Sequence, residues 1–306
     1  MAAILAERIC KHFGGVRAVD EVSLNVDRGT VFGFLGPNGA GKTTTMRILT
    51  GVLKPDSGSV HINGIDIAAD PVQAKQHIGV IPENSSVYGD LSARENILLT
   101  GKFYGIPRRE CRTRADELLS TMGLADRADD PVRRFSKGMK QRVSIACAIV
   151  HNPGILFLNE PTEGLDVQSK KMIYETIGEI KKDGRTVFLT THNIEEANTI
   201  CGIVGIINRG KMVTVDKPEV LKSTTDTTRS VEVSFSETVD AKWFASDSVV
   251  KIAEYGDKLR FFTADADSVI KELTEVARCR DLTITSLSTS GPSLEETFLK
   301  LTGGDA

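Results

Sequence analysis

The sequence predicts an α/β fold built on a buried parallel sheet, followed by a smaller α+β domain. Continuous apolar runs at residues 31–35, 155–158 and 186–189 are typical of strands that are covered on both faces. The first two runs lead through loops into segments with helical periodicity, as in strand–loop–helix units. Beyond residue 222 the pattern changes to short strands and two helices, which indicates a second domain.

The other elements of the first domain follow from local signals. Asn63-Gly64 is a strong hairpin signal between two short apolar segments. Helical periodicity with charged faces, from about residue 83 to residue 135, predicts an inserted helical subdomain. Alternating or continuous apolar patterns predict strands at residues 4–9, 16–26, 59–62, 65–67 and 78–81.

A glycine-rich loop follows the first apolar run and reads G-x-x-x-x-G-K-T from Gly36 to Thr43. Its glycines allow successive backbone N–H groups to point inward, and the helix predicted from residue 44 adds a dipole that favours an anion. Lys42 would then place its charge on the β- and γ-phosphates, and Thr43 would offer a hydroxyl to Mg²⁺. Taken alone, the loop has an alternative interpretation as a glycine-rich turn that enters a helix.

Polar residues follow the other two runs, where the predicted strands end. Asn159 and Glu160 come directly after residues 155–158, and His192 follows residues 186–189 after two threonines. The carboxyl ends of parallel strands meet at one edge of an open α/β sheet, where ligands bind. Glu160 is therefore the candidate to orient or deprotonate an attacking water, with His192 at the same edge. A solvated surface histidine is the alternative for His192.

Two further segments allow two interpretations each. Phe13 lies in the predicted turn between the first two strands, where it is placed either to stack on a purine or to pack at the edge of the core. Ser136 is an N-cap candidate for the helix that continues through residues 143–150, and Gly138 leaves the first turn open to an anion. An ordinary capped helix explains Ser136 and Gly138 equally well.

The composition excludes several classes of protein. The 38 basic and 41 acidic residues give a net charge of −3 without a dominant basic cluster, so we expect no nucleic-acid partner. No stretch approaches the roughly 18 apolar residues of a membrane span, and residues 1–6 are too short for a signal-peptide core. We expect a cytoplasmic protein. Its five cysteines include no C-x-x-C pair and are interpreted as buried thiols.

Over residues 1–222 these motifs resemble the ATP-binding subunits of ABC transporters, in the family's order and approximate spacing. The resemblance implies that Phe13 stacks on adenine and that residues 156–160 form the Walker B strand. It implies a signature motif at Ser136 and Gly138, a D-loop at Asp166 and a switch histidine at His192. The Walker A loop, which binds ATP, would consist of Gly36, Pro37, Asn38, Gly39, Ala40, Gly41, Lys42, Thr43 and Thr44.

The resemblance also implies partners and a mechanism. In this family two subunits pair head to tail, so that each signature helix caps the γ-phosphate that the opposite subunit holds. The dimer closes when it binds ATP and opens after hydrolysis, and this movement switches a transmembrane permease between two states. This implies an ATPase that uses Mg²⁺, with Lys42, Glu160 and His192 as catalytic residues. It would lie on the cytoplasmic face of the membrane, bound through the permease.

Three positions depart from the family's common pattern. Asn159 replaces the Walker B aspartate, which keeps an acceptor oxygen but removes a charge, and an engineered nucleotide-trapping substitution would leave the same residue. Glu83 replaces the sensing glutamine. We hypothesise that Glu83 restores the lost charge, so that Thr43, Glu83 and Asn159 are the predicted metal ligands; a Glu83 that faces a partner subunit is the alternative. Lys137 and Met139 give the signature a form that looks like those of drug-export and related ABC-2-type subunits.

The tail predicts a domain of its own. A polar bridge at residues 222–228 separates it from the cassette, so we place the domains at residues 1–222 and 223–306. The tail resembles the accessory domain of many ABC-2-type export subunits, and we interpret its Trp243 as a packing residue. Its expected elements are strands at residues 230–235, 249–255, 258–262 and 282–287, a helix at 265–277 and a last helix opened by a capping box at 293–296.

Three functions fit the sequence. The leading one is ATP hydrolysis that powers export through a separate transmembrane subunit. The alternative is an ATP-driven dimerising clamp with little hydrolysis, which Asn159 favours. A soluble family member that acts in translation or DNA repair is the third, but such proteins usually carry two cassettes or a very long coiled-coil insert. The cargo is not encoded in any motif that we identify.

Overall fold

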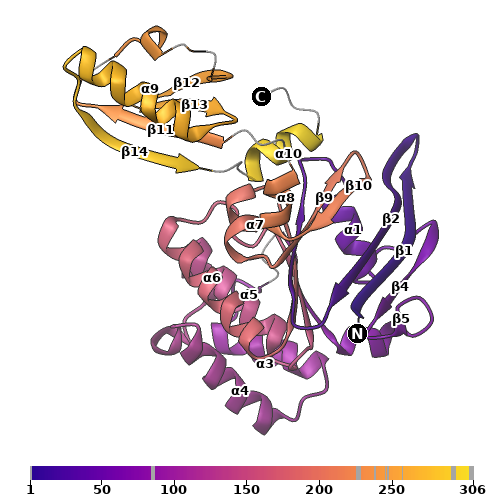
Figure 1. Ribbon diagram of the computed structural model, residues 1–306. Coiled ribbons are helices and arrows are strands. Elements are labelled where there is room, and N and C mark those ends of the chain that lie inside the picture. The colour runs from indigo at the N-terminus through magenta and orange to yellow at the C-terminus, as the bar shows by residue number, and fades with distance from the viewer. Residues whose placement is uncertain are drawn as a thin grey trace. The chain divides into compact units, whose positions relative to one another are not determined.

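A computed structural model describes residues 2–83, 87–224, 229–237, 239–244, 246, 248–256, 258–290 and 294–302. It divides the chain into two units, Met1–Asp216 and Lys217–Ala306. Figure 1 shows the elements of both units. None of the helices in these ranges combines the length and the hydrophobicity that a membrane crossing requires.

A six-stranded, mainly parallel sheet forms the centre of the first unit, which confirms the predicted α/β fold. Its order is β10-β9-β3-β8-β7-β6, and only β10 runs antiparallel to its neighbour. All residues of β3, β7 and β8 are buried, as the continuous apolar runs predict. The strands are β3 (Val31–Leu35), β6 (Ile78–Ile81), β7 (Ile155–Asn159), β8 (Thr186–Thr191), β9 (Ile203–Asn208) and β10 (Lys211–Asp216).

A second, antiparallel sheet has the order β2-β1-β4-β5 and comprises β1 (Ala2–Phe13), β2 (Val16–Asp27), β4 (Ser57–Ile62) and β5 (Ile65–Asp66). The predicted hairpin is confirmed, since Asn63 and Gly64 adopt φ angles of 50° and 86°, as a type I′ turn requires. The strand predicted at residues 4–9 is longer in the structure. Phe13 is consequently the last residue of β1, paired with Val16, rather than a residue of the turn.

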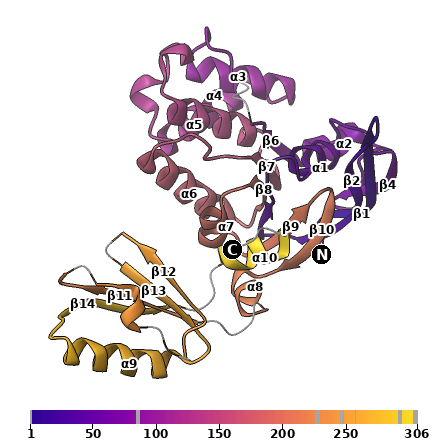
Figure 2. The ribbon, with the colours of Figure 1, turned by 90° about the horizontal axis from the view of Figure 1, so that it is seen from above.

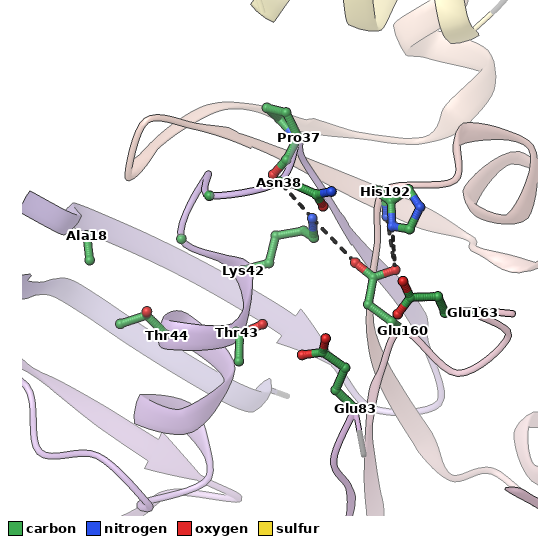
Figure 3. Close-up of a pocket in the computed structure, with 12 residues that line it drawn as sticks. Ala18, Pro37, Asn38, Lys42, Thr43, Thr44, Glu83, Glu160, Glu163 and His192 are labelled. Carbon is green, nitrogen blue, oxygen red and sulfur yellow. Dashed lines mark hydrogen bonds and ion pairs between the residues drawn. The ribbon is translucent and has the colours of Figure 1, made fainter. Parts of the chain in front are cut away.

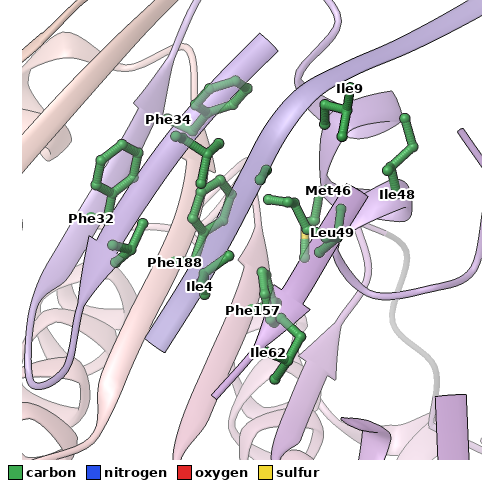
Figure 4. Close-up of a cluster of buried hydrophobic side chains, with 14 of the residues drawn as sticks. Ile4, Ile9, Phe32, Phe34, Met46, Ile48, Leu49, Ile62, Phe157 and Phe188 are labelled. Atoms are coloured by element: carbon green, nitrogen blue, oxygen red, sulfur yellow. The ribbon is translucent and has the colours of Figure 1, made fainter. Parts of the chain in front are cut away.

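The core of the first unit lies between these two sheets (Figure 4). Phe188 of β8 is at its centre, with its ring centroid 5.4 Å from the rings of Phe32 and Phe157 and 5.6 Å from that of Phe34. Ile4 and other side chains of the antiparallel sheet pack on the same cluster, together with the buried face of helix α1. These contacts hold β3, β7 and β8 rigidly, so that the ends of the strands are fixed in space.

Seven helices complete the first unit in the described ranges: α1 (Lys42–Leu49), α2 (Pro71–Gln76), α3 (Ala93–Phe103), α4 (Arg108–Thr121), α5 (Lys137–Ile149), α6 (Val167–Lys182) and α7 (Ile194–Ile200). Helices α3 and α4 lie within residues 83–135, where a helical subdomain is predicted. Both views show α3, α4 and α5 together, away from β1, β2 and β4 (Figures 1 and 2). Helix α2 was not predicted; it begins after the N-cap Asp70, whose side chain accepts from the Gln73 N–H at 3.0 Å.

The second unit has an antiparallel sheet of order β12-β13-β11-β14 with α9 packed on it. Helix α8 belongs to this unit and spans part of the predicted polar bridge; residues 225–228 and Ser293 of the predicted capping box lie outside the described residues. The elements are α8 (Pro218–Thr224), β11 (Arg229–Phe235), a 3₁₀ turn (Ala241–Phe244), β12 (Lys251–Tyr255), β13 (Lys258–Thr263), α9 (Ala266–Cys279), β14 (Ile284–Ser290) and α10 (Leu294–Thr302).

The second unit contains Trp243, which we predicted to be a packing residue. Trp243 is 39% exposed and its ring lies 4.1 Å from the Arg280 guanidinium, so it packs partly through a cation–π contact.

All five cysteines are free, but the prediction that they are buried holds only for Cys111, Cys147 and Cys201. Cys279 is exposed because it ends α9 on the solvent side.

Candidate nucleotide-binding site

Three parallel strands end at the same edge of the sheet. β3 pairs with β8 as far as Leu35 and Thr191, and β8 pairs with β7 as far as Thr190 and Asn159. Parallel pairing brings the carboxyl ends of strands together, so the residues that follow them emerge side by side. Among these residues are Gly36, Glu160 and His192.

A cavity of about 350 Å³ opens at this edge (Figure 3). This volume lies in the range of small-molecule sites, about 300–1,000 Å³. Five separate segments of the first unit contribute to it: strand β2, the loop into α1 with the first residues of that helix, the segment after β6, the loop after β7 and the loop after β8. The lining residues are Ala18, Pro37, Asn38, Gly39, Gly41, Lys42, Thr43, Thr44, Glu83, Glu160, Glu163 and His192.

Lys42 and His192 both contact Glu160 inside the cavity and approach its carboxylate from different sides (Figure 3). The Lys42 Nζ lies 3.4 Å from the Glu160 Oε1, and the His192 Nδ1 lies 2.9 Å from the Glu160 Oε2. The backbone N–H of His192 also donates to Oε2, at 3.3 Å. The side chains of Lys42 and Glu160 are only 7% and 10% exposed, so water screens their attraction little.

The backbone at Glu160 is strained. Its φ of 47° lies in the left-handed region, which a residue with a Cβ adopts rarely. Such strain persists only where the surrounding structure holds it, and it occurs often at functional sites. Here the Glu160 N–H donates to the Thr190 carbonyl at 3.0 Å, which anchors the residue to β8 as its side chain turns toward Lys42.

The loop into α1 has the geometry of an anion nest. Gly41 is the N-cap of α1 with a φ of 107°, and no side chain caps this helix. A Cβ at Gly41 would lie 2.4 Å from the Ala18 carbonyl oxygen, so only glycine fits. The Lys42 ammonium donates to the carbonyls of Gly36 at 2.7 Å and Pro37 at 3.3 Å. The helix N-terminus and one buried cation therefore face the same space, which suits a phosphate.

Two of the three predicted metal ligands line the cavity. Thr43 and Glu83 line the cavity, whereas Asn159 is 4% exposed and its amide oxygen accepts a hydrogen bond from the Thr190 hydroxyl. Within the described ranges no group of three or more His, Cys, Asp or Glu side chains is arranged to hold a metal ion. Mg²⁺ keeps several waters and needs only one or two protein oxygens beside substrate phosphates, so Thr43 and Glu83 fit it.

The remaining predicted residues lie outside the cavity of their own chain. Phe13 is 52% exposed, and the loop residues Gly36 and Ala40 are buried and do not line the cavity. Ser136 caps α5 as predicted: its hydroxyl accepts from the Met139 N–H at 3.2 Å. Asp166 caps α6 and accepts from the N–H and the hydroxyl of Ser169, both at 2.8 Å, and these bonds lower the pKa of its carboxyl. Ser136 and Asp166 are both exposed.

Gly138 is required for a contact between two helices, a reason that the sequence did not reveal. A Cβ there would lie 2.3 Å from the Ser169 Oγ and 2.8 Å from its Cβ, so α5 and α6 would have to separate. We expect Gly138→Ala to lower the free energy of unfolding by about 1–3 kcal/mol through overpacking. Urea unfolding of the wild-type and Gly138→Ala proteins measures this difference in the free energy of unfolding.

The matched control is Gly178→Ala. Gly178 lies in α6, and no atom lies within 4 Å of a Cβ placed there. This substitution should stabilise the protein by about 0.4–1 kcal/mol, because alanine restricts the unfolded chain. Equal effects of the two substitutions would show that the close approach of Gly138 to Ser169 has no energetic consequence.

Sequence reasoning missed two residues of the cavity. Glu163 lies in the turn that follows Glu160, and its position only three residues after a predicted site residue could have identified it. Ala18 lies in β2, far from the loop in sequence, and only the packing of the antiparallel sheet on α1 brings it to the cavity.

Comparisons with known proteins find a matching family model and relatives that align with nearly the full length of the chain. A family model described as ABC transporter matches residues 19–163. The linearmycin resistance ATP-binding protein LnrL of Bacillus subtilis (strain 168) is 36% identical over 303 residues, which are 97% of this chain and 97% of that protein. The Nod factor export ATP-binding protein I of Paraburkholderia xenovorans (strain LB400) is 34% identical and covers 99% of this chain and 97% of its own.

Solved structures match about seven-tenths of the chain. The structure of an ATP-binding subunit of an ABC transporter aligns with a TM-score of 0.67 and 29% identity, over 72% of this chain and 92% of that one. A dimeric ATP-binding cassette in a post-hydrolysis state, bound to ADP and Pi, aligns with a TM-score of 0.64 and 27% identity, over 70% of this chain and 98% of that one.

Proposed function

The chain belongs to the ATP-binding subunits of ABC transporters, and on that premise we propose that it hydrolyses MgATP to power export through a separate transmembrane subunit. The observation that carries the proposal is the convergence of Lys42, Glu160 and His192 on one cavity behind an anion-binding loop. Phosphoryl transfer asks a protein for positioning and charge stabilisation, which these groups can supply. Steady-state phosphate release, measured with and without Mg²⁺, tests it; release that requires Mg²⁺ is expected.

We infer a role for each of the three side chains. In this structure Lys42 pairs with a single carboxylate, and a triphosphate offers it more negative charge. Binding of ATP would therefore draw Lys42 from Glu160 and leave Oε1 free to accept a proton from an attacking water. Oε2 would stay bonded to His192, which fixes the orientation of the carboxylate. The His192 side chain is 44% exposed, so the entering nucleotide can reach it.

Mg²⁺, when bound, would neutralise charge on the phosphate oxygens, and Thr43 and Glu83 are the side chains that would hold it. The amide of Asn159 is turned to Thr190, so Glu83 supplies the charge that the family's usual aspartate would give. Glu83→Gln should then raise the Mg²⁺ concentration for half-maximal ATPase about tenfold, since a contact to a charged group contributes about 1.5 kcal/mol.

A magnesium titration of the Glu83→Gln protein at saturating ATP makes the measurement. Glu163→Gln is the matched control, because Glu163 is a second carboxylate in the same cavity that we do not assign to the metal. An unchanged midpoint in Glu83→Gln, or an equal shift in the control, would contradict the idea that Glu83 compensates for Asn159.

Two copies of the chain are proposed to act together, head to tail. Ser136 and Asp166 are exposed outside their own cavity, so they are available to a second copy. The Ser136 oxygen accepts from the Met139 N–H, and its own hydrogen therefore remains free to donate to a phosphate held by the partner. The solved dimeric cassette, bound to ADP and Pi, supports this arrangement.

The export role rests on the names of relatives, which include a linearmycin resistance protein and Nod factor export proteins. We propose that a permease subunit binds this chain on the cytoplasmic face of the membrane. A clamp with little turnover stays the second candidate, because Asn159 lacks the usual charge and is held by Thr190. Steady-state ATPase activity at saturating Mg²⁺ separates the two.

A further inference from the structure

A buried carboxylate lies behind the candidate catalytic residues. Glu196, in the first turn of α7, is 1% exposed, and none of the roles proposed above uses it. Burial raises the pKa of its carboxyl, while hydrogen bonds to Thr191 and Thr162 lower it. A carboxylate is costly to bury unless hydrogen bonds compensate for the water that it loses. The bonds that Glu196 forms therefore indicate what it does.

The hydroxyl of Thr162 donates to the Glu196 Oε1 at 2.8 Å. Thr162 lies two residues after Glu160 and is 3% exposed. On the other side, Glu196 itself lies in the segment that follows His192, four residues further along the chain. The fully buried Thr191 directly precedes His192. One carboxylate thus joins the loop that carries Glu160 to the loop that carries His192.

The turn between His192 and α7 is fixed by the same group of residues. The Asn193 side chain caps α7 by accepting from the Glu196 N–H at 3.1 Å, and the Asn193 N–H donates to the Thr191 hydroxyl at 2.9 Å. Both ends of the link are therefore constrained. The left-handed backbone of Glu160 needs such constraint, because a strained conformation relaxes when its surroundings loosen.

We propose that Glu196 is a positioning residue, which couples the loop after β7 to the loop after β8 and so preserves the mutual geometry of Glu160 and His192. The inference rests on the proposed ATP hydrolysis. Glu196 does not touch the cavity, so its loss should lower kcat and leave the KM for ATP nearly unchanged.

The experiment is a double-mutant cycle of Glu196→Leu and Thr162→Val. Each single variant should lose at least about tenfold in kcat, because small misplacement of catalytic groups is costly, with KM within about twofold. The double variant should lose no more than the worse single one. It should regain thermal stability, because replacing both partners of a buried hydrogen bond by apolar groups is nearly neutral. A purely structural role instead predicts that kcat recovers together with stability.

Two variants complete the design. Glu196→Gln keeps the shape and one acceptor oxygen, so it should recover part of the lost kcat. Thr263→Val removes another fully buried hydroxyl, in the second unit, and should leave kcat unchanged. Unchanged kcat in Glu196→Leu, or losses that multiply in the double variant, would overturn the proposal.

Amide hydrogen exchange separates this proposal from the proposed function. In nucleotide-free protein, residues 162–166 and 191–196 should both exchange faster in Glu196→Leu than in the wild type. Exchange that is unchanged in either segment overturns the coupling whatever the ATPase rate. A wild-type protein that hydrolyses no ATP overturns the proposed function, and faster exchange of both segments would still support the link between the loops.

Discussion

Replacing Glu160 with glutamine is expected to stop ATP hydrolysis while ATP still binds. The glutamine keeps the shape of the side chain and an oxygen that can accept from the His192 backbone N–H. In the wild-type protein this N–H lies 3.3 Å from the Glu160 Oε2. It cannot take a proton from water, and loss of a general base lowers kcat about 10²–10⁴-fold. It also removes the ion pair with Lys42, so ATP no longer competes with the carboxylate and should bind at least as tightly.

Phosphate release and equilibrium binding of ATP, measured on the same preparation, test this expectation. Glu163→Gln is the control, because it removes one negative charge from the same cavity and leaves in place the contacts of Glu160 with Lys42 and His192. The control should retain hydrolysis. If Glu160→Gln kept the wild-type rate, the proposed base would have to be another group.

Replacing Lys42 with alanine is expected to weaken ATP binding and to lower hydrolysis together. The ammonium is the buried cation that faces the loop, and the loss of a hydrogen bond to a charged group costs about 1.5–3 kcal/mol, or about 10–150-fold in affinity. The substitution also leaves the Glu160 carboxylate without its cation, which adds repulsion against an incoming triphosphate.

Isothermal titration with ATP measures the effect of Lys42→Ala. Arg47→Ala is the matched control: Arg47 lies on the same helix α1, is exposed and does not line the cavity. Its removal should change ATP affinity by less than about twofold, since charges far from the ligand are screened. Equal affinities of wild type and Lys42→Ala would contradict the assignment of the loop.

The central sheet could be predicted because its strands are buried on both faces. β3, β7 and β8 have no solvent-facing residues, so each appears in the sequence as an unbroken apolar run. Helix α2 was missed because its six residues are too few to show a period. The full length of β1 was missed because its last residues alternate little, so Phe13 was assigned to a turn.

The candidate site was predictable where the chemistry is local. Residue type and spacing are enough to identify the loop from Gly36 to Thr43 and the residues that follow the strands β7 and β8. Contacts between distant segments were not predictable. The contact of Gly138 with Ser169 and the bond between Thr162 and Glu196 depend on how helices pack, and no local pattern encodes them.

Determining the structure of the Glu160→Gln protein with ATP and Mg²⁺ tests the central claim most directly. The account predicts a triphosphate in the cavity of one copy, with its γ-phosphate beside Lys42 and His192 and the Ser136 hydroxyl of a second copy facing it. A nucleotide bound elsewhere, or held in the cavity by a single copy with Ser136 of any neighbour far away, would contradict it.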